Sequence, residues 1–481
     1  MKFLLLLLIS INTYAFDQTK RFVAHKTDKR FLSFALDTAL LVGSYWWNES
    51  GEAEGGRGRH KIAPFDILNP LFIKRTSALA PAYFRVGGSE ADALFYAIKE
   101  ENPQFDSQLT KEKINELKTF IQKTKLDLFF TLNAGPLHWK DKTYASANVK
   151  LLIDYFKQIE LPAVYEFGNE VLAYWAIWGI NKQISTKEYS HAFAKVRDEN
   201  QIKLAGAASA FWPVIGEPMG FLFGKVTSII KKLKRKMDII TWHYYPVQSS
   251  RCPVAIRRAN LSRFFDAKTF DAIIPFAKEM HEYHHNYAPS SELWMGETGS
   301  AQCGGMKGLS DTFLSSLWWA DELATLALYK HDIVIRQSIV GGDYALLDFK
   351  SLKPRPDYWL SLLWKKLMGQ RVIRLPFQNS GKLLRIYQHC HPEKGSTSLI
   401  INASKYIREE VFQNDVKVYQ LTSPQLDKSL YLNQKLVKTT KDLDSYMLGS
   451  KIKLPPRSIS FIHNERDQFC SIEGMPSRHA F

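Results

Sequence analysis

Long apolar runs are missing from this sequence, and so are internal repeats and low-complexity tracts. A membrane-spanning helix needs about 20 consecutive apolar residues, and no segment reaches that length without a charge. The missing apolar run excludes a membrane-spanning helix, and the apolar composition excludes a solvated linker protein. Hydrophobic residues make up 45% of the 481 positions, which is enough for one large domain and a smaller second one.

Acidic residues are also in short supply. The chain has 48 Asp and Glu against 64 Lys and Arg, a formal charge of +16. A surplus of this size favours a polyanionic partner, which could be nucleic acid, an anionic membrane or an acidic polysaccharide.

The N-terminus narrows this choice. Lys2 precedes an apolar stretch from Leu4 to Ile11, and Thr13 to Ala15 offer small residues for cleavage, so we predict a signal peptide over residues 1–15. We expect a secreted or extracellular protein, periplasmic in a bacterium, that meets glycans before nucleic acid. We therefore predict an acidic polysaccharide as partner, with no nucleic acid and no stable membrane insertion.

Cysteine is scarce, but its even number fits an oxidising compartment. Three pairings are possible among the four: Cys252, Cys303, Cys390 and Cys470.

Short apolar segments alternate with stretches of helical spacing along most of the chain. The eight predicted strands are 31–37, 83–88, 127–133, 164–170, 203–208, 238–245, 293–298 and 333–337. Strand and helix in strict alternation predict a parallel sheet, and eight such strands predict an α/β fold of the (β/α) TIM-barrel type over residues 31–372. From residue 373 to 481 the pattern alternates with period 2, which predicts a smaller antiparallel β-sandwich.

Two predicted barrel strands end in a carboxylate. Glu170 ends the fourth strand and Glu297 ends the seventh. The carboxyl ends of barrel strands form the open, reactive face, and two carboxylates there fit the acid/base and nucleophile of a retaining glycosidase. For a single Glu, capping of the next helix or pairing with an arginine would be the better interpretation.

Neighbouring residues support this pairing. Tyr244 or Tyr245 can hydrogen-bond Glu297 and keep it ionised, and Asn169 can bind the sugar 2-hydroxyl. Arg85 lies inside the second strand, where a buried guanidinium needs an anionic partner; catalytic carboxylates are its best candidates.

At these residues the chain resembles the heparanase family of retaining β-glucuronidases, which includes leech-type hyaluronidase. The resemblance covers almost the whole mature chain and rests on seven segments: Tyr83 to Ser89, Phe167 to Glu170, Thr241 to Tyr245, Leu293 to Thr298, Leu309 to Phe313, Ile335 to Gln337 and Pro356 to Leu360.

This resemblance implies a barrel with a C-terminal β-sandwich to which residues 16–30 also contribute, with Glu170 as acid/base and Glu297 as nucleophile. It further implies side-chain contacts to the glucuronide from Asp37, Ser89, Asn133, Asn169, Gln337 and Tyr344. Backbone amides near Cys303 and Gly304 would receive the uronate carboxylate, and Cys390 would pair with Cys470.

The chain departs from the family pattern at the loop after the seventh strand. Gln302 and Cys303 replace a Tyr-Gly pair, and the loop after the sixth strand carries Cys252. Because these loops are neighbours in a barrel, we predict a Cys252–Cys303 disulfide. On the same rim, Arg251, Arg257 and Arg258 are candidate contacts to sulfate or uronate.

We therefore expect a monomeric, cofactor-free and metal-free endo-β-glucuronidase acting on heparan sulfate or a related chain. Three alternatives remain: exo-β-glucuronidase action, with the 43–60 loop closing the cleft; hyaluronan cleavage; and a glycan-binding protein without catalysis.

Overall fold

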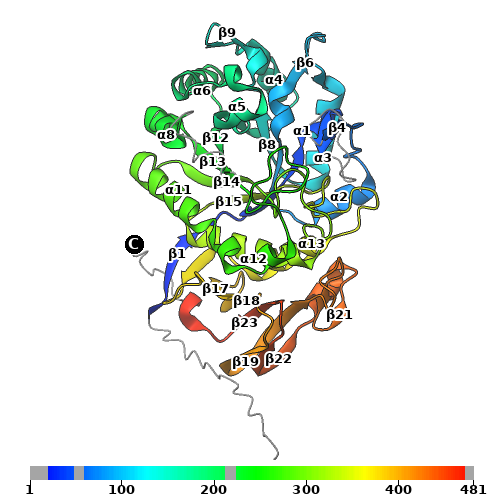
Figure 1. The fold of residues 1–481 in the computed structure, drawn as a ribbon, viewed down its shortest axis with the longest axis vertical. Coiled ribbons are helices and arrows are strands. Elements are labelled where there is room, and N and C mark those ends of the chain that lie inside the picture. Colours follow the sequence, from blue (N-terminus) through cyan, green and yellow to red (C-terminus); the bar gives the residue numbers. More distant parts are fainter. Residues whose placement is uncertain (1–19, 48–58, 212–223, 472–481) are drawn as a thin grey trace, which may run out of the picture.

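The computed structural model describes residues 20–47, 59–211 and 224–471. The predicted signal peptide and most of the 43–60 loop lie outside the described residues. Eight parallel strands form a closed barrel surrounded by helices, which occupies the upper part of Figure 1. The barrel strands are β2 (Leu32–Asp37), β5 (Tyr83–Gly87), β8 (Asp127–Leu132), β11 (Ala163–Phe167), β12 (Leu204–Phe211), β13 (Ile239–Tyr244), β14 (Glu292–Thr298) and β15 (Ile333–Arg336).

Each barrel strand is followed by a helix of eight residues or more. These helices are α2 (Pro70–Ser77), α3 (Lys111–Thr124), α4 (Ala147–Gln158), α6 (Thr186–Asn200), α8 (Val226–Leu233), α11 (Ile274–Tyr287), α12 (Phe313–Leu328) and α13 (Pro356–Leu367). Among the described residues, four shorter helices lie in connections: α1 (Thr38–Val42), α5 (Tyr174–Ile177), α9 (Leu261–Phe264) and α10 (Ala267–Asp271). The predicted strands and the TIM-barrel class are confirmed.

One sequence pattern that we interpret as a single helix is two helices in the structure. Residues 267–287 form α10 and α11, with Pro275 in the first turn of α11. Proline lacks an amide hydrogen and its ring clashes with the preceding turn, so it is tolerated at a helix start and not in its interior.

The barrel interior is layered because side chains alternate along each strand. An apolar layer at the amino ends of the strands includes Tyr83, Phe129 and Trp294, whose rings pack against one another. Two residues further along, Arg85 and Glu166 are fully buried charged side chains. The apolar layer therefore acts as a floor beneath a charged layer at the carboxyl ends.

A second, antiparallel sheet lies below the barrel in Figure 1. Its strands are β1 (Phe22–Lys26), β16 (Arg371–Arg374), β17 (Leu384–Cys390), β18 (Ser396–Asn402), β19 (Arg408–Thr422), β20 (Tyr431–Leu432), β21 (Lys435–Leu436), β22 (Met447–Leu454) and β23 (Ser458–Asn464). The outermost described segment of the N-terminus, β1, pairs with β16. The boundaries at 30/31 and 372/373 stay a prediction.

Both faces of this sheet bury apolar side chains. Tyr387, Leu399 and Phe461 join the main core with the barrel helices. A separate cluster includes Ile386, Ile400 and Ile452 on the other face. A sheet that is buried on both sides agrees with the predicted sandwich class.

A buried arginine joins the sheet to the barrel. Arg385 of β17 is inaccessible to solvent and pairs with Asp321 of α12 and, at 2.8 Å, with Asp271 of α10. Tyr387 also donates to Asp321, at 2.5 Å. The two parts of the molecule are thus connected by charged as well as apolar contacts.

Both predicted disulfides are formed. Cys390 pairs with Cys470, and Cys252 pairs with Cys303. Among the described residues, no helix has the length and apolar character needed to cross a bilayer.

The described part of the barrel loops contains three small two-stranded sheets: β3 (Tyr45–Trp47) with β4 (Arg59–Lys61), β6 (Leu94–Ala97) with β7 (Ser107–Thr110), and β9 (Trp139–Lys140) with β10 (Thr143–Tyr144).

Candidate active site

Glu170 lies in the turn directly after β11 and is 6% exposed. Its φ of +53° is in the left-handed region, which costs free energy for a side chain other than glycine and is concentrated at functional sites. The turn is held by Asp92, whose carboxylate accepts hydrogen bonds from the backbone N–H groups of Asn169 and Ala134 at 2.8 and 2.9 Å. Asp92 therefore ties the ends of β8 and β11 together beneath Glu170.

Glu297 reaches the barrel interior through an irregularity in β14. Simple alternation would put Trp294 and Gly296 inside and Glu297 outside. The register of β14 shifts against both neighbouring strands around residues 296–297, and such a bulge changes the direction of a side chain. As a result, the Glu297 carboxylate faces Arg85 at 2.7 Å and Tyr245 at 2.6 Å.

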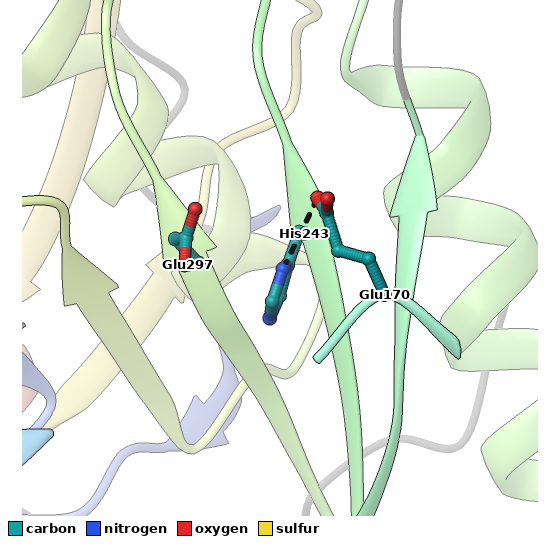
Figure 2. Close-up of side chains that lie close together, drawn as sticks. All are labelled: Glu170, His243 and Glu297. Atoms are coloured by element: carbon teal, nitrogen blue, oxygen red, sulfur yellow. Dashed lines mark hydrogen bonds and ion pairs between the residues drawn. The ribbon is translucent and has the colours of Figure 1, made fainter. Parts of the chain in front are cut away.

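Figure 2 shows Glu170, His243 and Glu297 extending from the strand ends into one space, with Nδ1 of His243 3.4 Å from Oε1 of Glu170. One ligand-type atom from each residue lies within 4.8 Å of the other two. Retaining glycosidases hold their carboxyl groups about 5–5.5 Å apart, whereas inverting enzymes need about 6.5–9.5 Å. The spacing of the two carboxylates is therefore that of a retaining pair.

The same three side chains could in principle hold a metal ion, since a histidine and two carboxylates are common ligands. However, Glu297 already forms an ion pair with Arg85 at 2.7 Å, and the guanidinium charge opposes a second cation at that carboxylate. The donor set fits acid/base chemistry better than metal binding.

Arg85 connects the charged layer. It donates to Glu166 at 2.8 and 3.0 Å, to Glu297 at 2.7 Å and to Asn169 at 2.9 Å. A Cβ on Gly87 would lie 2.6 Å from the guanidinium carbon, so glycine is needed there. The expectation that Arg85 pairs with a carboxylate of the site is confirmed.

The electrostatic environment of Glu297 favours its ionised form. Burial raises the pKa of its carboxyl, but the charges of His243 and Arg85 and the hydrogen bonds from Tyr245 and Arg85 outweigh burial and bring the pKa below its ordinary value. Burial has the opposite net result at Asp37 and Asp92, raising the pKa of Asp37 well above its usual range and that of Asp92 to about 7.

The loop after β14 presents unused backbone donors. Cys303, Gly304 and Gly305 have φ values of +62°, +83° and +82°, and no described residue accepts a hydrogen bond from their N–H groups. Successive free N–H groups in a turn form an anion-binding concavity. The Cys252–Cys303 disulfide joins this loop to the loop after β13.

Several other predicted contacts lie around these residues. Asp37 ends β2, and Nε2 of Gln337 is 3.4 Å from its carboxylate. Tyr344 stacks on Tyr245, and its carbonyl accepts from Arg336 at 2.8 Å. Ser89 begins the turn after β5.

The structure does not bring every predicted residue to the site. The ring of Tyr244 packs against Trp242 and Phe276, outside the barrel, because it is one residue out of phase with the inward-facing Tyr245. The side-chain amide of Asn133 is used within its own loop, accepting from Gly135 and donating to the carbonyl of Leu94.

Arg251 also differs from its predicted role as a cleft-facing cation. Its guanidinium pairs with Asp343, and its side chain is only 5% exposed. It cannot serve as a free contact to sulfate.

Two residues of the site were missing from the sequence prediction. Glu166 accepts hydrogen bonds from Arg85 and, at 2.9 Å, from Thr131, and Asp92 holds the turn before Glu170. A charge inside the apolar segment Ala163 to Phe167 was the available signal for Glu166. No pattern pointed to Asp92.

Comparison with known proteins is consistent with this geometry. The profile for the N-terminal domain of glycosyl hydrolase family 79 matches residues 22–324. Mouse (Mus musculus) heparanase is 31% identical over 396 residues, covering 76% of this chain and 71% of that protein. Bovine (Bos taurus) heparanase is 27% identical over 527 residues, covering 93% and 90%.

The fold also matches solved structures of low sequence identity. A 4-O-α-L-rhamnosyl-β-D-glucuronidase from Fusarium oxysporum superposes with a TM-score of 0.66 at 13% identity, covering 92% of this chain and 97% of that one. This likeness concerns the arrangement of barrel and sheet.

Proposed function

The chain belongs to glycosyl hydrolase family 79, and from that premise we propose that it cleaves β-glucuronide bonds in an acidic polysaccharide with retention of configuration. The enzyme is a glycoside hydrolase. The observation that carries the finer proposal is the spacing of Glu170 and Glu297, whose nearest ligand oxygens lie within 4.8 Å, as a double-displacement reaction requires.

Glu297 is the nucleophile in this proposal. Its ionised oxygen attacks the anomeric carbon while Glu170 protonates the leaving oxygen, giving a covalent glycosyl-enzyme ester. Glu170 then removes a proton from water, and the resulting hydroxide displaces Glu297 from the anomeric carbon. The lowered pKa of Glu297 supports its role as the nucleophile. His243 lies beside Glu170, and this polar neighbour supports the role of Glu170 in giving up and taking back a proton.

Asn169 binds the sugar 2-hydroxyl. Its Oδ1 accepts from Arg85, whereas its Nδ2 has no partner among the described residues. Because Arg85 holds Oδ1, it fixes the orientation of the amide and leaves Nδ2 to donate to the 2-hydroxyl. A contact to this hydroxyl strengthens in the transition state.

The sugar carboxylate binds the N–H groups of residues 303–305. These donors are free within the described chain and lie on the loop after β14, the strand that carries the nucleophile. Several aligned backbone N–H groups stabilise the negative carboxylate of a uronic acid more than the neutral hydroxymethyl group of a hexose. The loop therefore fits a uronate better than a neutral sugar.

Heparan sulfate is the proposed substrate, cleaved internally. The charge of +16 supports attraction of a sulfated polyanion. Exo-action on glucuronides is the second candidate, favoured by contact between Trp47 of the β3–β4 hairpin and Gly304: a Cβ on Gly304 would lie 2.7 Å from that of Trp47. This contact brings Trp47, in the described part of the 43–60 segment, to one end of the site.

We also propose that the protein is exported and acts as a monomer. Two disulfides support an oxidising compartment. Sequencing the N-terminus of the exported protein checks this, and a chain that still starts at Met1 would contradict cleavage after residue 15.

Product analysis tests the proposed function. Wild type, Glu170→Gln and Glu297→Gln are incubated with heparan sulfate, hyaluronan and 4-nitrophenyl β-D-glucuronide, and the first-formed anomer is identified by proton NMR. We expect the β-anomer from wild type, and about 10²- to 10⁴-fold slower turnover of natural chains by Glu170→Gln, the range for loss of a general acid.

The product size separates the candidates. Oligosaccharides from heparan sulfate indicate internal cleavage, and released monosaccharide indicates exo-action. An initial α-anomer, or full activity of Glu297→Gln, would reject the assignment of the two carboxylates.

A further inference from the structure

Arg251 lies behind the loop that carries the free N–H groups. Its Nη1 donates to the carbonyl oxygens of Gly304 and Gly305 at 3.3 and 2.8 Å. The backbone N–H of Asp343 donates to the same Gly304 oxygen at 2.6 Å. The carbonyl oxygens of Gly304 and Gly305 therefore point toward Arg251.

A buried ion pair fixes Arg251 in this position. The guanidinium pairs with the carboxylate of Asp343, and the two side chains are 5% and 6% exposed. A buried pair of this kind is costly to break, because the remaining charge would be left without a partner. Arg251 is therefore a rigid element of the loop and does not sample the solvent as a surface arginine would.

The Cys252–Cys303 disulfide adds a covalent connection at the same place. Cys252 follows Arg251 in the chain and Cys303 precedes Gly304, so the disulfide and the hydrogen bonds hold adjacent residues. The loop is also closely packed, since a Cβ on Gly305 would lie 2.5 Å from the backbone nitrogen of Tyr344.

We propose that Arg251, supported by Asp343 and by the disulfide, is a positioning residue that sets the preference for uronic acids over neutral sugars. This inference rests on the proposed glucuronidase function. Because the guanidinium holds the carbonyls of residues 304 and 305, the N–H groups of the loop stay available as an anion site. The guanidinium is neutralised by Asp343 and does not contact the sugar itself.

Arg251→Gln tests this proposal against a matched control. Arg21→Gln removes another buried arginine, which pairs with Asp467 at 2.8 Å with side chains 6% and 7% exposed, next to β1 in the antiparallel sheet. Steady-state kinetics are measured with 4-nitrophenyl β-D-glucuronide and 4-nitrophenyl β-D-glucoside.

We expect Arg251→Gln to lower kcat/KM for the glucuronide by about 10- to 100-fold, the range for hydrogen bonds to a charged group. The loss should lie mainly in KM, and kcat/KM for the glucoside should change little. Arg21→Gln should keep the wild-type ratio between the two substrates. Equal effects of both variants on that ratio would overturn the proposal.

Two further variants separate positioning from folding. Arg251→Gln with Asp343→Asn removes the buried charge that the single variant leaves unpaired, and should recover stability without recovering the substrate ratio. Cys252→Ser with Cys303→Gly removes the disulfide, and glycine at position 303 tolerates the φ of +62° found there. It should reduce the ratio in the same direction, whereas Cys390→Ser with Cys470→Ser should not.

Calorimetric binding of D-glucuronate, with D-glucose as the comparison, distinguishes this inference from the proposed function. If wild type hydrolyses no glucuronide but binds glucuronate in an Arg251-dependent manner, the inference stands and the hydrolytic proposal fails. If glucuronides are hydrolysed and Arg251→Gln binds glucuronate like wild type, the inference fails alone. Neither binding nor hydrolysis by wild type would reject both.

Discussion

Tyr245 and Arg85 each hold one oxygen of Glu297, at 2.6 and 2.7 Å. Both contacts lower the pKa of that carboxyl, so they keep the proposed nucleophile ionised. Arg85 also donates to Glu166 and Asn169, whereas the hydroxyl of Tyr245 bonds Glu297 and no other described residue. Tyr245 is therefore the residue at which this single interaction can be removed.

Tyr245→Phe should lower kcat/KM by about 10- to 100-fold, from loss of a hydrogen bond to a charged group. Since the hydroxyl lowers the pKa of Glu297, its removal raises that pKa. Glu297 acts only when ionised, so the acidic limb of the pH profile of kcat/KM should move to higher pH. Tyr244→Phe is the control, because its ring faces outward, and an equal shift in that variant would contradict the role of Tyr245.

Site residues at the ends of barrel strands could be predicted from the sequence, whereas site residues at other positions could not. Glu170 and Glu297 were found because barrel strands open at their carboxyl ends. Glu166 and Asp92 act through partners that only barrel closure brings near, at separations of 81 and 77 residues. Tyr244 and Tyr245 could not be distinguished before the phase of β13 was known.

At the scale of elements, α12 is unusual because residues 313–327 are all buried. It lies between the barrel and the antiparallel sheet (Figure 1), and it carries two acidic residues, Asp321 and Glu322. Burial raises the pKa of Glu322 from 4.5 to about 8. The hydroxyl of Thr298 contacts both Glu322 and the carbonyl of Tyr244. Because this hydroxyl can donate only one hydrogen bond, a protonated Glu322 that donates to it would satisfy both contacts.

Glu322→Gln should weaken the pH dependence of stability. Between about pH 4.5 and 8 the folded protein holds a proton on Glu322 that the unfolded chain has lost, so wild type loses stability as pH rises through 8. The slope for one carboxyl is at most about 1.4 kcal/mol per pH unit. Urea unfolding at several pH values measures it, and the comparison cancels other titrating groups. Parallel curves for both proteins would contradict a neutral Glu322.

The order of barrel elements could be predicted well because strand and helix periods differ clearly. The break between α10 and α11 was missed although Pro275 marks it. Strand β22 is hard to recognise from the sequence, since residues 447–454 are largely exposed and show weak alternation. In the structure, β19 pairs with β22 along most of the length of β22.

At the scale of the whole molecule, Arg385 joins the antiparallel sheet to the barrel through Asp321 and Asp271. Arg385→Met should destabilise the protein by about 3–5 kcal/mol, because Asp321 is left buried without its cation. Arg385→Met with Asp321→Leu should recover part of this loss. Thermal unfolding monitored by circular dichroism measures both.

Lys417→Met serves as the control, since its pair with Glu465 is partly exposed and such pairs contribute about 0–1 kcal/mol. A cost for Arg385→Met no greater than that of the control would show that apolar packing alone holds the two parts together.

The pairing of β1 with β16 has a consequence for biosynthesis. Thr27 and Gln370, which flank this pair and bond to each other, are 343 residues apart. A nascent chain emerges N-terminus first, so β1 leaves the ribosome long before its partner exists. An extended segment with unpaired backbone groups invites association with other chains. The enzyme must therefore keep its first strand from aggregating until translation is nearly complete, and a truncation before residue 371 would leave that strand permanently without its neighbour.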